Sequence, residues 1–147
     1  MYGNDRDRMR RFYMETWRKA QSGATLEALE QRVAGVIADH PEYQPLLAPG
    51  NEAVLARDYQ PENGQTNPFL HMGLHITLRE QAGTDRPPGI RAQIERLAAH
   101  LGDRLEAEHR LMDPLGEALW AAQRAGTPPD EAAYLERVKR VVSAAGA

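Results

Sequence analysis

Two histidines, His71 and His75, stand four residues apart in a segment that is apolar nearly all round. Such a segment is typical of a central, buried helix. Residues with this spacing project from one face of a helix, about one turn apart. Because two imidazoles so placed can chelate a metal ion, the sequence predicts a pair of nitrogen ligands on this helix.

A second group of polar residues shares one face of a later predicted helix. At about 100° per residue, its members fall within roughly 80° of one another; they are Glu106, His109, Asp113 and Glu117. Leu105 and Trp120 lie on the same face, so we expect it to be partly covered. If the two helices face each other in a bundle, four donors converge: His71, His75, His109 and Asp113.

The first hypothesis is therefore a metal-binding helical bundle. His71, His75 and His109 would be ligands, and Asp113 would be a fourth ligand or orient one. The second shell, or a general base toward a metal-bound water, would come from Glu106, Glu108 or Glu117. The expected cofactor is one divalent transition ion, Zn²⁺, Fe²⁺, Mn²⁺ or Ni²⁺. Hydrolytic, thiol-transfer and redox chemistry stay open, and whether the chain is an enzyme stays open with them.

The second hypothesis needs no metal. A buried His71 or His75 could hydrogen-bond to Asp113, Glu108 or a backbone carbonyl, and the network would fix the register of the helices. The protein would then be a non-enzymatic interaction or structural module. Its two tryptophans and a tyrosine-rich connector would present an aromatic surface to a protein partner or to a second copy of the chain.

Two further histidines stand at predicted helix ends. His40 precedes Pro41, and His100 lies close to Gly102. At a helix C-terminus an imidazole can hydrogen-bond the last carbonyls or interact favourably with the helix dipole. We therefore predict structural roles for both.

Composition restricts the remaining chemistry. The chain of 147 residues has no cysteine, which excludes disulfides, thiol catalysis and cysteine-ligated metals. Its 18 basic and 21 acidic residues give a net charge of −3, which argues against a nucleic-acid partner. Near the N-terminus, acidic residues interleave with a group of arginines and predict a solvated helix face; the group is Arg6, Arg8, Arg10, Arg11 and Arg18.

The chain shows no targeting or membrane signal. Its polar start is not followed by an apolar stretch, unlike a secretory signal. No segment approaches the roughly 20 apolar residues that span a bilayer. We therefore expect a cytoplasmic protein with no membrane partner.

The apolar spacing predicts an all-α fold, a single-domain bundle over residues 1–147 with about five main helices. A helix over residues 5–21 is followed by a second helix, which has its N-cap at Thr25 and ends at His40. The later expected helices are 68–81, 90–101, 103–123 and a last helix opened by residues 127–130. Pro114 should kink or divide the long helix. Residues 41–67 form an irregular connector with helical turns around Tyr43–Leu47 and Glu52–Ala56, and its part 58–66 could cover the predicted site.

Several longer motifs carry a resemblance to a known family. They are residues 57–71 with His75 and Glu80-Gln81, and the shorter stretches 40–43, 87–91, 107–109 and 115–117. Together they resemble a bacterial family known as domain of unknown function 1841, over nearly the whole chain. The resemblance implies a small bacterial single-domain protein and assigns no catalytic or binding residue. A weaker likeness is to DinB-like and hemerythrin-like bundles, which also place His-x-x-x-His pairs inside a bundle; the full ligand pattern of neither is present.

Overall fold

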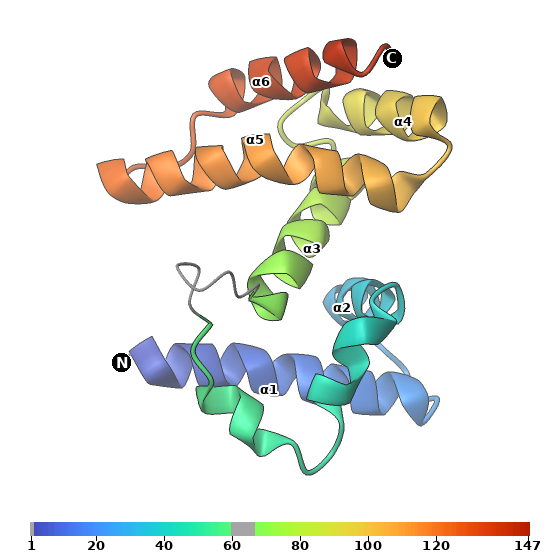
Figure 1. The fold of residues 1–147 in the computed structure, drawn as a ribbon, viewed down its shortest axis with the longest axis vertical. Helices are drawn as coiled ribbons and strands as arrows, with labels where there is room; N and C mark the ends of the chain where they lie inside the picture. Colours follow the sequence, from blue (N-terminus) through green and yellow to red (C-terminus); the bar gives the residue numbers. More distant parts are fainter. Residues whose placement is uncertain (1, 60–66) are drawn as a thin grey trace. The chain divides into compact units, whose positions relative to one another are not determined.

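The computed structural model describes residues 2–59 and 67–147, and in these ranges the chain is all-α, with no strand (Figure 1). The predicted fold class is confirmed. The elements are six α-helices and two 3₁₀ helices: α1 Tyr2–Gln21, α2 Ala28–Ala38, η1 Pro41–Leu47, η2 Glu52–Ala56, α3 Pro68–Thr84, α4 Ile90–Leu101, α5 Arg104–Ala125 and α6 Glu131–Ala144. All six α-helices lie at the expected helical segments, against a predicted number of about five main helices.

The contacts group the chain into two compact units. The first unit is Met1–Ile76 and the second unit is Thr77–Ala147, so the boundary lies inside α3. The single domain over residues 1–147 stays a prediction. None of the described helices combines the length and the low charge of a membrane-spanning helix.

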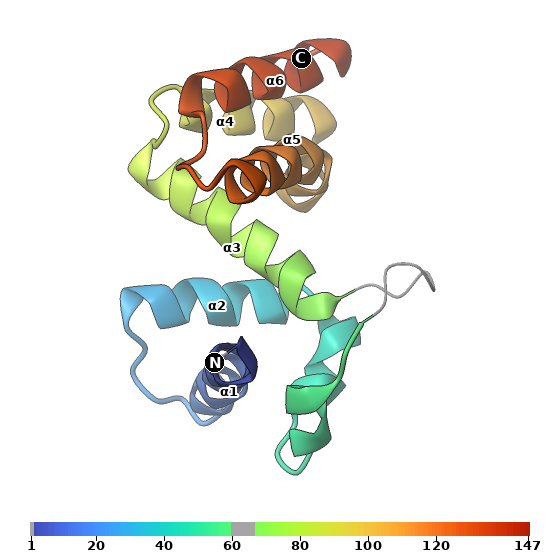
Figure 2. The same cartoon turned by 90° about the vertical axis from the view of Figure 1, so that its left-hand side faces the viewer.

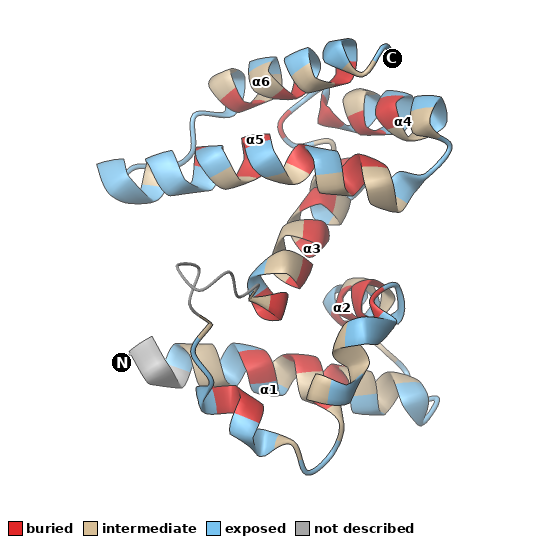
Figure 3. Ribbon diagram, viewed as in Figure 1, coloured by how far each residue is buried: buried red, intermediate tan, exposed pale blue. Residues whose placement is uncertain are grey.

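In the first unit, α1 packs against α2, η1 contacts both of these helices, and η2 contacts α1 (Figure 2). Burial follows one face of each helix (Figure 3). The start of α3 joins this core through Phe69, whose ring centroid lies 5.7 Å from that of Tyr13. Core residues are Tyr13, Val33, Val36, Ile37, Leu47, Val54, Phe69, Met72 and Ile76. The first two turns of α3, which carry His71 and His75, are therefore anchored in the first unit.

Local signals fix the helix ends that matter here. Asn67 caps α3 as predicted, because its Oδ1 accepts from the backbone N–H groups of Phe69 (3.0 Å) and Leu70 (3.2 Å). The helix continues to Thr84, beyond the predicted end at Gln81. The predicted N-cap at Thr25 is wrong, since Glu27 caps α2 and its N–H donates to the Glu30 carboxylate at 2.9 Å.

Arg10 ties the connector to α1. Its guanidinium is buried and donates to the carbonyls of Val54 (2.8 Å) and Arg57 (2.8 Å), and it lies 4.7 Å from the ring centroid of Phe69. The prediction of a solvated arginine face is therefore wrong for Arg10. The two predicted helical turns are confirmed as η1 and η2. Most of the segment 58–66, predicted as a cover, lies outside the described residues.

In the second unit, α4, α5 and α6 contact one another. Their shared core is apolar and includes Ile90, Ile94, Leu97, Leu111, Leu115, Val138 and Val142. Helix α5 is continuous through Pro114, so the predicted division does not occur. Asp103 caps α5 and Asp130 caps α6, each by accepting a backbone N–H. The predicted start of the last helix is thereby confirmed.

Candidate metal centre

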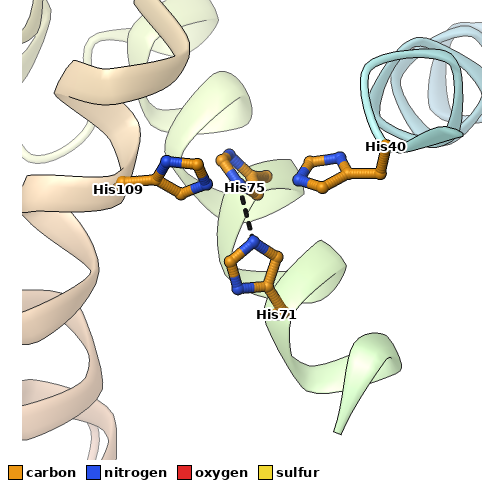
Figure 4. A group of neighbouring side chains, drawn as sticks. All are labelled: His40, His71, His75 and His109. Carbon is orange, nitrogen blue, oxygen red and sulfur yellow. Dashed lines mark hydrogen bonds between the residues drawn. The ribbon is translucent and has the colours of Figure 1, made fainter. Parts of the chain in front are cut away.

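The histidine pair of α3 lies as its spacing predicts. His71 and His75 project from one face of the helix, and their Nε2 atoms are 3.3 Å apart (Figure 4). The side chain of His75 is fully buried, while that of His71 is half-buried. The pair therefore stands at the edge of the first unit's core.

A third histidine, His40, completes a cluster that the sequence did not predict. Its ring centroid lies 5.1 Å from that of His71 and 4.6 Å from that of His75. His40 sits between the end of α2 and η1, where Pro41 begins the 3₁₀ helix, and it is 2% exposed. We call His40, His71 and His75 the histidine cluster. Its only signal in the sequence was a histidine that ends an apolar helix.

The hydrogen bond of His40 determines which ring nitrogen faces a ligand. Its Nδ1 lies 2.7 Å from the carbonyl oxygen of Val36, and a carbonyl only accepts, so Nδ1–H is the donor. Nε2 then carries the lone pair. The predicted capping of a helix carbonyl is confirmed. A metal-binding histidine usually donates its second ring N–H to a carbonyl or carboxylate in this way.

The distances within the histidine cluster fit a single ion. Each residue offers a ring nitrogen within 4.8 Å of the others. Two nitrogens bound tetrahedrally to Zn²⁺ at about 2.0–2.1 Å lie about 3.3–3.4 Å apart. The His71–His75 separation of 3.3 Å matches that edge of a tetrahedron. The same separation also suits a hydrogen bond between two neutral imidazoles.

The donor set limits the kind of ion. Imidazole nitrogen suits Zn²⁺, Cu²⁺, Fe²⁺ and Ni²⁺, whereas Mg²⁺ and Ca²⁺ prefer oxygen ligands. Because all three side chains of the histidine cluster are imidazoles, the first unit is chemically suited to a transition metal ion.

The other predicted ligands lie on α5 in the second unit. Within its own unit, the Nδ1 atom of His109 lies 3.7 Å from a carboxylate oxygen of Glu106. Asp113 is exposed, which gives no support to a role as a ligand. Glu117 is exposed as well, and its carboxylate lies 3.9 Å from Arg137.

Glu108 is the buried carboxylate of α5. It is 1% exposed, and its two oxygens accept from Nε and Nη2 of Arg79 at 3.1–3.3 Å. This bidentate pairing neutralises the carboxylate within the second unit. The geometry therefore favours a structural ion pair over the predicted role as a general base.

Fold and site together define an all-α protein with three imidazoles gathered at the core of its first unit. A family model described as a domain of unknown function, DUF1841, matches residues 5–140. The chain belongs to this family, which confirms the resemblance drawn from its motifs. No curated protein and no solved structure matches the chain.

Proposed function

We propose that this protein binds one divalent transition metal ion through ring nitrogens of His40, His71 and His75. The observation that carries the proposal is the 3.3 Å separation of the His71 and His75 Nε2 atoms inside a group of three imidazoles. Two of the three side chains are buried, which protects a bound ion from water. Zn²⁺ fits this donor set and spacing best.

The sequence prediction that His109 and Asp113 are ligands stays a prediction, since both residues lie on α5 in the second unit. Three protein ligands leave a tetrahedral ion one position for a further donor or for water. Because two of the three imidazoles are buried in the first unit, the proposal gives the metal a role in stabilising that unit.

Metal analysis of protein purified without chelator tests this proposal. About one ion per chain is expected, and Zn²⁺ at about 100 times its Kd should raise the free energy of unfolding by about 2.7 kcal/mol. His40→Ala, His71→Ala and His75→Ala should each weaken binding at least about 100-fold. His100→Ala is the matched control, because His100 is exposed on α4. Absence of metal, with no thermal shift by Zn²⁺, Fe²⁺, Mn²⁺ or Ni²⁺, would contradict the proposal.

The second candidate function is a non-enzymatic module whose histidines form a hydrogen-bonded network. It is favoured by the hydrogen bond of His40 to Val36 and by a His71–His75 distance that suits an N–H···N bond. A protein partner would then meet the exposed Leu119 and Trp120 of α5. Addition of a chelator separates the two candidates. It lowers the melting temperature of a metal-bound wild type and leaves His75→Ala unchanged, whereas a network without metal gives no chelator effect in either protein.

A further inference from the structure

Tyr43 of η1 lies against two members of the histidine cluster. Its ring is stacked on that of His40, with centroids 5.5 Å apart and planes 6° from parallel. It meets the ring of His71 edge to face, at 5.9 Å and 75°. His40 and His71 belong to different elements, so the one ring of Tyr43 contacts proposed ligands from two elements.

Tyr43 is itself held in place by the local fold. Its backbone N–H donates to the His40 carbonyl at 2.9 Å, and the Gln44 side chain donates to the Ile37 carbonyl at 3.1 Å. Pro41 and Pro45 fix φ at two positions of η1. The ring is partly buried against the core of the first unit. The position of Tyr43 is therefore set by contacts other than those of its ring with the imidazole rings.

The planes of the imidazole rings determine where their lone pairs point, because each lone pair lies in the plane of its ring. His40 is held at Nδ1 by Val36, and stacking on Tyr43 further restricts the plane of its ring. The edge-to-face contact restricts the ring of His71 in the same way.

We infer that Tyr43 is a positioning residue of the metal centre, which sets the ring planes of His40 and His71 so that their nitrogens are aimed before the ion arrives. This inference rests on the proposed function. It assigns the effect to the aromatic ring of Tyr43 and not to its hydroxyl group. A binding site whose ligands are fixed in advance loses less conformational entropy on binding.

Co²⁺ binding to the full chain tests this inference, because the visible spectrum of Co²⁺ reports the geometry of its ligands. We expect Tyr43→Phe to match the wild type within about 2-fold in affinity and to keep its spectrum. Tyr43→Leu should weaken binding about 10-fold, which is about 1.4 kcal/mol, and should change the spectrum. Tyr43→Met is the second variant, for use if Tyr43→Leu does not fold.

Tyr59→Leu is the matched control. Tyr59 is another half-buried tyrosine of the first unit, and its ring lies near Arg10 and Arg57. Its loss should leave Co²⁺ affinity and spectrum unchanged. Wild-type affinity and spectrum in folded Tyr43→Leu or Tyr43→Met would overturn the role of Tyr43 alone. A wild-type protein that takes up no Co²⁺ would overturn the metal centre, and the inference with it.

Discussion

The two units of the chain bury polar side chains in different ways. The first unit gathers His40 and His75, both almost fully buried, beside His71. The second unit buries the carboxylate of Glu108 and pairs it with Arg79. The first arrangement concentrates imidazole nitrogens, and the second cancels a negative charge with a positive one.

This difference teaches which buried polar groups are suited to bind a ligand. A buried carboxylate costs several kcal/mol unless a cation accompanies it, so the fold supplies that cation from its own side chains. A neutral imidazole needs only hydrogen bonds and keeps a lone pair that a metal ion can use. Glu108, the buried carboxylate of α5, follows this rule because Arg79 of the second unit accompanies it.

The largest expected effect comes from breaking the ion pair of the second unit. Glu108→Ala should lower the free energy of unfolding by about 3 kcal/mol, because it leaves Arg79 without its carboxylate in a mostly buried place. In the presence of chelator, His75→Ala should cost less, about 1–2 kcal/mol, because a neutral group is removed. Urea unfolding measures both. With metal removed, a larger loss of unfolding free energy for His75→Ala than for Glu108→Ala would contradict this difference between the units.

A smaller effect, shared by the two units, concerns one buried tyrosine in each. Burial raises the pKa of Tyr13 and of Tyr134 to about 12. Because the folded chain keeps these protons longer than the unfolded chain, the stability they contribute is complete below about pH 10 and is lost as the pH rises through about 12. At about pH 11, one unit above the ordinary pKa, the loss is about 1.4 kcal/mol per tyrosine.

Urea unfolding of the wild type at about pH 8 and about pH 11 measures this alkaline loss. Tyr13→Phe should reduce the loss, since a phenylalanine has no proton to release. Equal losses in the wild type and in Tyr13→Phe would show that Tyr13 does not contribute.

The smallest expected effect is at Glu117. Its carboxylate is exposed and 3.9 Å from Arg137, and exposed ion pairs contribute little. Glu117→Gln should change the free energy of unfolding by less than about 0.5 kcal/mol and should leave metal affinity unchanged. A marked loss of metal in this variant would restore the second-shell role that the sequence predicted for Glu117.

Helix periodicity predicted the parts of the site that lie on one element. His71 and His75 share a helix, so their spacing alone places both imidazoles on one face. Asn67 and Pro68 marked the start of that helix correctly, because a cap is a local signal.

Helix periodicity did not predict the contacts between different elements. His40 follows the end of α2 and contacts the pair across more than 30 residues of sequence, and no spacing in the sequence records such a contact. Arg10 belongs to a run of alternating charges that predicts a solvated face, yet three backbone carbonyls of the connector and a ring of α3 bury it. In both cases contacts between distant residues decided the outcome, and for Arg10 they overrode the local charge pattern.

The most direct test of the metal centre is X-ray absorption spectroscopy of the Zn²⁺-loaded protein. The proposal predicts a first shell of nitrogen at about 2.0–2.1 Å, with the multiple scattering of three or four imidazoles, and loss of one imidazole in His40→Ala. A first shell of oxygen without imidazole scattering, or a spectrum that His40→Ala leaves unchanged, would contradict it.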